Sequence, residues 1–500
     1  MTSLASPIIL VRYSSGGNRL SSHLCFSVRR SSLQGTILIP KYYDPELADA
    51  LDVAQHEFDL IPLRQLLHPD SNGSRLGDWV RREYYGTGDI PYVRTSDLVG
   101  WRIRPDFKKG VSDAVYQRLR AKQDIEPGDV LMVAHGTYLV GTVAIVTDHD
   151  ARLVLQDHVF RLRPSSAHGI TGKYLLAALS TAFVKRQVRS KQFSADIIDK
   201  IGDRHLDILV PVPKDRSRIP TIEIQVEAVI SSGTRFRETA TKLIGAQLRM
   251  LRERSDARHG YFVSRSSLRN RILLPKYYDP DLETALRAEE ADWGEQWPSL
   301  GDLCDMGLLS AQTGVEVGKL AYGTGTIPFI RTSDIADWEV RLDTKQCISQ
   351  EFFDQCAHKA SVDKGDILIV RDGTYLVGSS ALVSSDDVPA LICGGIYRLR
   401  CLNPVALSPE TLFALLNLPL TRRQMRARQF TRDVIDTLGK RLLEVKIPPP
   451  TSKKAITLGK EVSTIFVLKE HAKKSMANIV QSLEPPIPQK SANRPGWSMR

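Results

Sequence analysis

Arginine, glutamine, lysine and histidine side chains stand at polar positions beside apolar segments, where they could contact nucleic acid bases. Arginine pairs with guanine, and glutamine with adenine, through two hydrogen bonds, each pair worth about 1–3 kcal/mol of discrimination. A solvated basic helix end would show the same residue types, so both interpretations stay open. The candidates for base contacts are His135, Lys191, Gln192, Arg371, Arg428, Gln429 and Arg432.

A second group of residues suits contact with phosphates, which fix the position of a protein on DNA. Arg94 and Arg331 each end an apolar run and precede a Thr-Ser-Asp sequence. A salt bridge to that aspartate is the alternative for each arginine, and a turn or helix cap is the alternative for the hydroxyl residues. Two tyrosines, which could equally pack in a core, complete the group: Arg94, Thr95, Ser96, Tyr138, Arg331, Thr332, Ser333 and Tyr375.

The sequence contains no pattern typical of a catalytic site. It has no Asn/Asp-Pro-Pro-Tyr/Phe motif for adenine methyl transfer, no H-E-x-x-H motif and no histidine–cysteine cluster for zinc. Asp366 and Asp372 lie around one apolar run, as nuclease carboxylates can, but no lysine stands at a useful spacing. We therefore expect a binding protein with no catalytic residue, no metal site and no cofactor of its own.

Most of these candidates occur twice because the chain repeats itself. The sequence Pro-Lys-Tyr-Tyr-Asp-Pro begins at Pro40 and again at Pro275, and Gly136–Gly141 returns as Gly373–Gly378. The repeated unit is far longer than the roughly 20–50 residues of a solenoid repeat. Two domains of one fold, suited to touching two similar things, are therefore expected.

Comparison of the two copies separates two kinds of position. Residues identical in both copies are expected to be scaffold or phosphate contacts, whereas exposed positions that differ are better candidates for reading bases. Residues 134–135 correspond to 371–372, 157–158 to 394–395, and 190–195 to 427–432.

The bulk composition agrees with a polyanionic partner. The chain has 68 Lys+Arg against 57 Asp+Glu, a net charge of +11, which favours nucleic acid, although many soluble proteins are mildly basic. Its six cysteines form no C-x-x-C pair and only Cys25 lies in the first copy, so reduced thiols are expected. No apolar run reaches the roughly 18 residues of a membrane span. We expect a cytoplasmic protein with no membrane partner.

Local patterns predict the elements of each copy. Asp44-Pro45 and Asp279-Pro280 read as helix starts, with aspartate as the cap. Strands buried on both faces are expected at 130–133 and 367–370, and half-exposed strands at 159–163 and 396–400. Helical sequence follows at 173–191 in the first copy, and at 408 onward, broken near Pro419, in the second. Each copy is expected to close with a strand, at 208–213 and 445–450.

A long amphipathic helix is expected after each copy. Apolar residues recur at heptad spacing for about four repeats in both places. Gly233, Gln247 and Lys469 weaken these seams and could fix the register of a helix pair. The alternative is two independent helices that each lie on their own module. The seams are Ile222, Val226, Val229, Gly233, Phe236, Ala240, Leu243, Gln247 and Met250, and Ala455, Leu458, Val462, Ile465, Lys469, Ala472, Met476, Ile479 and Leu483.

A module that ends in a long helix and is repeated once resembles the specificity (S) subunit of type I restriction–modification systems. The resemblance covers residues from about 58 to 484. The first copy departs from it at Leu63–Leu66, where the second has Leu-Gly-Asp-Leu, and about 60 residues precede that point. The segments that carry it are Leu300–Leu303, Gly325–Ile335, Gly365–Ile369, Gly373–Gly378, Tyr397–Arg400, Leu415–Pro419 and Ile447–Pro450.

The resemblance implies a protein without catalytic activity. Two target-recognition domains would each read a few base pairs of a bipartite site in double-stranded DNA. The paired helices would set the spacing and bind DNA adenine methyltransferase subunits, two being expected, and restriction or translocase subunits could join them. S-adenosylmethionine, and ATP with Mg²⁺ where a restriction subunit is present, would belong to those partners.

The expected fold is mixed α/β (α+β), with two similar target-recognition domains separated by a pair of long antiparallel coiled-coil helices. A two-module protein-interaction scaffold without DNA specificity is the alternative function, and a nuclease with an undetected carboxylate set is a third. The expected parts are a first recognition domain with an N-terminal extension (1–215), a central helix (216–258), a second recognition domain (259–450), a C-terminal helix (451–484) and a disordered tail (485–500).

Overall fold

The structure of this chain is a computed structural model in which two compact units are distinguished by their internal contacts. One consists of Met1–Gly233 with Ala472–Arg500, and the other of Thr234–His471. The described residues are 8–13, 24–29, 37, 40–69, 73–104, 109–136, 139–150, 152–195, 198–252, 261–268, 272–318, 321–336, 338–340, 346–373, 377–432 and 435–486. Most of the predicted tail therefore lies outside the described residues.

A four-stranded antiparallel sheet forms the centre of the first unit. Its order is β11 (Val143–Ile145), β9 (Val130–Val133), β13 (Val159–Leu162) and β4 (Ser74–Leu76). Strand β9 is buried on both faces, which confirms the prediction for residues 130–133.

Smaller sheets surround this centre. Strand β5 (Ile90–Val93) pairs in parallel with β12 (Val154–Leu155) and antiparallel with β8 (Gly110–Val111), and α3 (Asp113–Gln123) follows. The others are β10 (His135–Gly136), β15 (Ile198–Lys200) and β14 (Phe193–Ala195); β6 (Leu98–Val99) and β7 (Arg102–Ile103); β3 (Phe58–Pro62) and β16 (Leu209–Pro213); and β1 (Ile8–Tyr13) and β2 (Leu24–Arg29).

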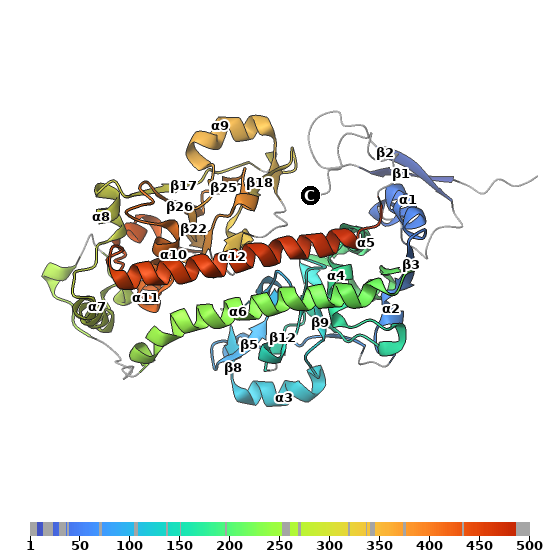
Figure 1. Ribbon diagram of the computed structural model, residues 1–500, viewed down its shortest axis with the longest axis horizontal. Helices are drawn as coiled ribbons and strands as arrows, with labels where there is room; N and C mark the ends of the chain where they lie inside the picture. Colours follow the sequence, from blue (N-terminus) through green and yellow to red (C-terminus); the bar gives the residue numbers. More distant parts are fainter. Residues whose placement is uncertain are drawn as a thin grey trace, which may run out of the picture. The chain divides into compact units, whose positions relative to one another are not determined.

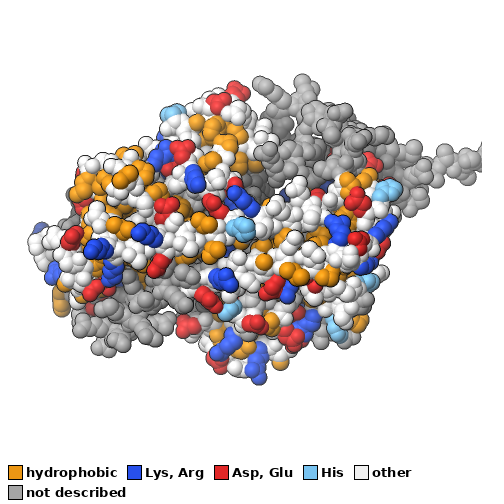
Figure 2. Space-filling model, viewed as in Figure 1, with side chains coloured by type: hydrophobic (Ala, Val, Ile, Leu, Met, Phe, Trp, Pro, Cys, Tyr) orange, Lys and Arg blue, Asp and Glu red, His pale blue; other side chains and the backbone are white. Residues whose placement is uncertain are grey.

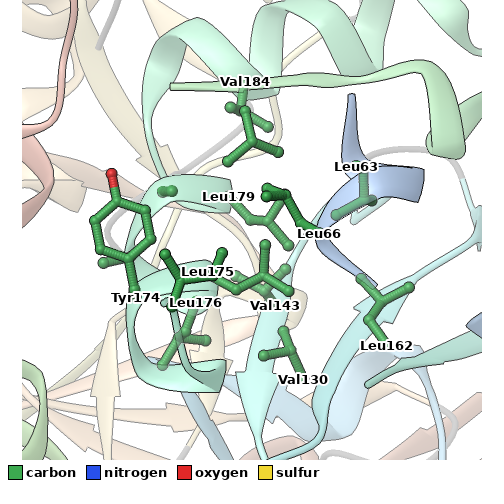
Figure 3. Packing of buried hydrophobic residues seen from close by; sticks show 14 of the residues in the cluster. Leu63, Leu66, Val130, Val143, Leu162, Tyr174, Leu175, Leu176, Leu179 and Val184 are labelled. Atoms are coloured by element: carbon green, nitrogen blue, oxygen red, sulfur yellow. The ribbon is translucent and has the colours of Figure 1, made fainter. Parts of the chain in front are cut away.

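Two helices occupy the segment where one was predicted, and the first of them packs on the central sheet. Helix α4 (Gly172–Leu179) ends before Ser180, and α5 (Ala182–Lys191) begins after Thr181, whose hydroxyl oxygen accepts the N–H of Val184 at 3.2 Å. The hydroxyls of Ser180 and Thr181 both donate to carbonyl groups of α4, and such bonds compete with helix continuation. Figure 3 shows the α4 side chains against those of β9 and β11.

Strand β13 is buried along its whole length, so the half-exposed strand expected at 159–163 is wrong. It lies between β9 and β4, and core side chains cover both its faces. Arg161 is only 1% exposed, and its Nη1 lies 3.7 Å from the buried Asp129. Arg163 donates from Nε and Nη2 to the two oxygens of Asp129 at 2.9 and 3.0 Å, and these bonds raise the pKa of Arg163. The alternation of apolar and basic residues here reflects buried ion pairs, not exposure.

The second unit repeats the central four-stranded sheet and three of the smaller sheets of the first. Arg398 is buried as Arg161 is, and Arg400 donates to Asp366 at 2.7 and 2.6 Å as Arg163 does to Asp129. The sheets are β24 (Ser380–Leu382), β22 (Ile367–Val370), β26 (Ile396–Cys401) and β17 (Leu309–Thr313); β21 (Cys347–Ile348), β18 (Ile327–Ile330) and β25 (Leu391–Ile392); β23 (Asp372–Gly373), β28 (Ile435–Thr437) and β27 (Phe430–Arg432); and β19 (Ile335–Ala336) with β20 (Glu339–Val340).

The helices of the two units also correspond, and Figure 1 shows their places in each. The predicted helix starts are confirmed, since Asp44 accepts the N–H of Glu46 and Asp279 that of Asp281. The break at Pro419 is confirmed as well. The helices are α1 (Pro45–Ala54) and α2 (Leu63–Leu66) in the first unit, and α7 (Pro280–Trp293), α8 (Leu300–Asp305), α9 (Gln350–Ala360), α10 (Pro409–Asn417) and α11 (Pro419–Ala427) in the second.

One difference between the units contradicts the sequence prediction. In the first unit the closing strand β16 pairs with β3 as expected. The strand expected at 445–450 is absent from the described second unit, where a single bridge joins Ser299 to Lys446. Three successive prolines, Pro448–Pro450, have no N–H to donate, which explains why the pairing does not extend.

The long helices are α6 (Arg218–Arg252) and α12 (Lys453–Ser482). Inside the first unit, the start of α6 and the end of α12 share one core, and Arg218 Nη2 donates to the carbonyl of Ser482 at 3.0 Å. The two segments are therefore antiparallel there, as expected. Just beyond α12, the Glu484 carboxylate accepts the N–H groups of Ala182 and Phe183 at the start of α5, both at 2.7 Å. The side chains of Phe236, Ala240, Leu243, Gln247 and Met250 lie outside the described part.

Gly233 and Lys469, which interrupt the two heptad patterns, each contact a strand of their own module. A side-chain carbon on Gly233 would lie 2.5 Å from Cδ of Arg102 on β7. Lys469 Nζ lies 3.5 Å from the carboxylate of Glu339 on β20, the equivalent of β7. Side chains from both helices also join the main core of their own module.

Candidate nucleic-acid interface

Three strands of the second unit end beside one another. Strand β18 leads into Arg331 and Thr332, β22 into Arg371 and Asp372, and β25 into Cys393 and two glycines. Cys393 N donates to the last carbonyl of β18 at 2.9 Å, and Arg371 N donates to the carbonyl of Gly395 at 2.8 Å. These main-chain bonds hold the three strand ends together.

Side chains converge at the same place. A side-chain carbon on Gly395 would lie 2.9 Å from Cγ2 of Thr332 and 3.9 Å from Cβ of Asp372, and one on Gly394 would collide with the Glu316 carboxylate. The absence of side chains at both glycines leaves room for these neighbours. We call this group the second strand-end cluster: Glu316, Arg331, Thr332, Arg371, Asp372, Gly394 and Gly395.

Arg371 is held by its neighbour in the chain. Its Nε and Nη2 donate to Oδ2 of Asp372 at 2.8 and 2.5 Å, while Oδ1 accepts the hydroxyl of Thr437 at 2.5 Å. Burial alone would lower the pKa of Arg371, but the bonds and charge of Asp372 raise it. The guanidinium is thus charged and oriented while a quarter of its surface remains exposed.

The Arg-Thr-Ser-Asp segments form caps in both units. The buried Asp97 and Asp334 accept the N–H of Arg94 and Arg331 at 2.9 and 2.8 Å, which fixes the short helices Thr95–Asp97 and Thr332–Asp334. Ser96 and Ser333 also donate to these aspartates, each at 3.4 Å. The turn-or-cap alternative therefore has direct support. Arg94 lies 3.9 Å from Asp97 and is half-buried, whereas Arg331 is exposed and reaches no acidic side chain in the described part.

The first unit carries different side chains at the same strand ends. Ala134 N donates to the carbonyl of His158 at 2.8 Å, which matches the bond between Arg371 and Gly395. The rings of His135 and His158 lie 5.0 Å apart, and burial, then the charge of His158, lowers the pKa of His135. We call this group the first strand-end cluster: Trp79, Arg94, Thr95, Ala134, His135, Asp157 and His158.

Lys191 and Arg428 lie stacked on aromatic rings instead of forming solvated helix ends. Lys191 Nζ lies 5.2 Å from the ring centre of Tyr42, and burial lowers the pKa of Lys191. The guanidinium of Arg428 lies 5.9 Å from the ring centre of Tyr277. The Lys-Tyr-Tyr segments thus pack against the ends of α5 and α11. These contacts place both basic side chains beside the Lys-Tyr-Tyr segments.

The predicted glutamines differ in exposure. Gln192 is buried, with 8% of its surface exposed. Gln429 is half-buried and donates to the carbonyl of Val377 at 3.2 Å. Tyr138 and Tyr375 lie outside the described residues, and so does the side chain of Arg432.

The next features concern the surface charge, metal ligands, helix hydropathy and cysteines of the described part. The side chains coloured in Figure 2 show acidic and basic groups interspersed on the visible face. Within the described part, no three His, Cys, Asp or Glu residues are arranged to hold a metal ion. None of the described helices combines the length and hydropathy that a bilayer crossing requires. The cysteines whose side chains are described are free thiols: Cys304, Cys347, Cys356, Cys393 and Cys401.

Trp79 and Glu316, which belong to the strand-end clusters, were not among the predicted site residues. They occupy equivalent positions in the two units, but the segments around them have few residues in common. The repeat offset of 237 residues, counted from Gly136 and Gly373, would have paired them.

Comparison with known proteins gives similarity at low sequence identity. No family model matches the chain, and no curated protein matches it. Among solved structures it is similar to a type I restriction–modification S subunit from M. genitalium, at 13% identity over 86% of this chain and 97% of that one, with a TM-score of 0.31. It is also similar to the HsdS subunit from Thermoanaerobacter tengcongensis, at 14% identity over 86% and 95%, with a TM-score of 0.24.

A third similar chain comes from a structure concerned with complex assembly and conformational transition of the type I R–M system. Its identity is 15%, over 85% of this chain and 95% of that one, with a TM-score of 0.26. Two of these three solved proteins are described as parts of a type I restriction–modification system, and the other as an HsdS subunit.

Proposed function

We propose that this chain is the DNA-specificity subunit of a type I restriction–modification system, or of a related methylation-only or phage-defence complex. Each module would read one half of a bipartite target in double-stranded DNA. The observation that carries this proposal is the pair of strand-end clusters, which share one backbone frame and differ in their side chains.

The shared frame is detailed. Strand order is the same in four sheets of each module, and the bond from Ala134 to His158 has the same length, 2.8 Å, as that from Arg371 to Gly395. The capping aspartates and the buried Arg–Asp pairs also recur. Because the backbones match, the side chains at positions 134–135 and 371–372 start from the same backbone geometry in the two modules.

The chemistry presented is different in the two modules. The first offers two histidines and a tryptophan, whereas the second offers an arginine fixed by an aspartate, together with a glutamate. Base edges in the major groove are distinguished by their pattern of donors, acceptors and methyl groups. Two clusters of different chemistry therefore suit two different half-sites, and the net charge of +11 suits the phosphates that all sequences share.

The long helices offer surfaces for partner subunits. Helix α12 exposes Ile456, Val467 and Leu468, and α6 exposes Ile224 at 71%. Contiguous exposed apolar surface marks protein contacts, and Val467 and Leu468 are adjacent in the chain. We assign these positions to the docking of adenine methyltransferase subunits, which would carry S-adenosylmethionine and the chemistry. The helices would set the spacing between the half-sites.

Selection from a library of random duplexes tests the proposal. The full chain, combined with methyltransferase subunits of such a system, should enrich two short constant blocks separated by a gap of fixed length. Binding should weaken steeply with salt because phosphate contacts release counterions. A protein-interaction scaffold would enrich no sequence, and that result would refute the proposal.

A further inference from the structure

Trp79 and Glu316 occupy one structural position in the two modules. Each follows a residue that bridges in parallel to the segment after β12 or β25: Asp78 to Gln156 and Val315 to Cys393. Equivalent main-chain bonds fix both segments, from Asp78 N to Leu155 O at 2.9 Å and from Val315 N to Ile392 O at 3.1 Å. The two side chains therefore leave the backbone at the same point beside their strand-end clusters.

Glu316 reaches into the second cluster from its rim. The residue is exposed, and its carboxylate lies against Gly394, where any side-chain carbon would collide with it. Its charge acts on Arg371 and on Cys393, both at the strand ends. An acceptor thus stands beside a charged arginine donor, and the two together could recognise one base pair and its neighbour.

Trp79 itself carries no acceptor group. It is 65% exposed, which is unusual for the largest apolar side chain, and the next residue, Val80, is buried. Asp157 and His158 stand where the second cluster has two glycines. An indole there offers a flat apolar surface and no acceptor.

We infer that this position determines specificity in each half of the target. The inference rests on the proposed function and names a contact within it. The Glu316 carboxylate accepts a hydrogen bond from the N4 amino group of a cytosine, the base for which acidic side chains are suited. Trp79 makes an apolar contact with the methyl group of a thymine at the corresponding place in the other half-site.

Substitutions at position 316 test this contact on the full chain with its methyltransferase subunits. Duplexes that differ in one base pair of the selected target are compared by competition binding. Wild type should prefer cytosine at one position by about 5- to 150-fold. Glu316→Ala should abolish that preference. Glu316→Gln, which keeps the size of the side chain, should shift the preference toward adenine, because glutamine pairs with adenine N6 and N7.

A substitution at position 79 provides the converse test. Trp79→Glu should change the preferred base at one position, from thymine to cytosine, in the half-site read by the first module. The half-site read by the second module should be unaffected. Glu295→Ala is the matched control, since Glu295 is also an exposed acid of the second unit and lies outside the cluster. It should leave every preference unchanged.

The outcomes separate this inference from the proposed function. If wild type selects no bipartite sequence, the proposed function fails. If wild type selects one but Glu316→Gln and Trp79→Glu select the same sequence as wild type, only the inference is overturned. Uniform weakening over all duplexes, without a change of preference, would likewise overturn it, because that result indicates a structural or electrostatic role.

Discussion

Lys469 Nζ of α12 lies 3.5 Å from the carboxylate of Glu339 on β20, and both side chains are largely buried. The equivalent positions in the first unit are Gly233 and Arg102, where the arginine side chain lies over the glycine. Each long helix therefore meets the same hairpin of its own module in the same register. The helix–hairpin contact occurs at the same position in both modules, but it is an ion pair in the second and an arginine packed on a glycine in the first.

Replacement of Lys469 by methionine should destabilise the second unit. The change removes a cation from a buried carboxylate, and loss of one partner from a buried pair costs about 3 kcal/mol of unfolding free energy. Calorimetric unfolding of the full chain measures it. The double variant Lys469→Met with Glu339→Met should recover most of the loss, since it removes both charges. A single variant as stable as wild type would show that the pair contributes nothing.

The first unit should lose stability as the pH falls below about 6.5. His205 is buried against Phe160, and burial lowers its pKa below the ordinary value of 6.5, as it does for His135. The unfolded chain therefore binds protons at a higher pH than the folded one, so unfolding is favoured as the pH decreases and the loss is complete below the folded pKa. Unfolding followed between pH 8 and pH 5 measures this dependence.

The second unit supplies the control for this prediction. Nδ1 of His205 donates to the carbonyl of Gly202 at 2.7 Å, so Nε2 accepts the hydroxyl of Ser74 at 2.7 Å. The equivalent pair is Leu442 and Ala311. His205→Leu with Ser74→Ala copies that pair and should reduce the pH dependence. An unchanged dependence would exclude His205 as its source.

Two arginines of the second cluster should respond differently to alanine. Arg371→Ala should relax the choice of base at one position of one half-site, at a cost of about 1–3 kcal/mol. Arg331→Ala should weaken binding evenly over all sequences and reduce the slope of log affinity against log salt by about one. Competition binding at several salt concentrations distinguishes them. Equal behaviour of the two variants would contradict the division between base and phosphate contacts.

Shortening of both long helices should change the gap between the half-sites. Removal of one heptad from α6 after Gly233 and one from α12 after His471 takes about 10 Å from each helix, the length of about three base pairs. The selected gap should shorten accordingly while both half-site sequences persist. A gap that does not change would refute the spacing role of the helices.

The duplication made much of the fold predictable. Repeated helix starts at Asp44 and Asp279 and the buried strand β9 follow from local rules, because capping and apolar runs act within a few residues. Exposure was harder to predict. Arg161 looked like the solvent face of a strand, but its partner Asp129 stands 32 residues away in the sequence, and only the sheet brings them together.

The candidate site was predicted in part for the same reason. The divergent positions 134–135 and 157–158 could be identified by comparing the copies, and the structure places them side by side. The contact between Lys191 and the ring of Tyr42 could not be inferred, since the two residues are distant in sequence. The burial of Gln192 could not be predicted from the sequence either.

The central claim is that each module reads its own half of the target. Its most direct test is duplex selection with two variants, His135→Ala/His158→Ala in the first cluster and Glu316→Ala/Arg371→Ala in the second. Our account predicts that each double variant alters one constant block, a different one in each case, and leaves the gap and the other block as in wild type. Alteration of the same block by both variants, or of neither block by either, would contradict it.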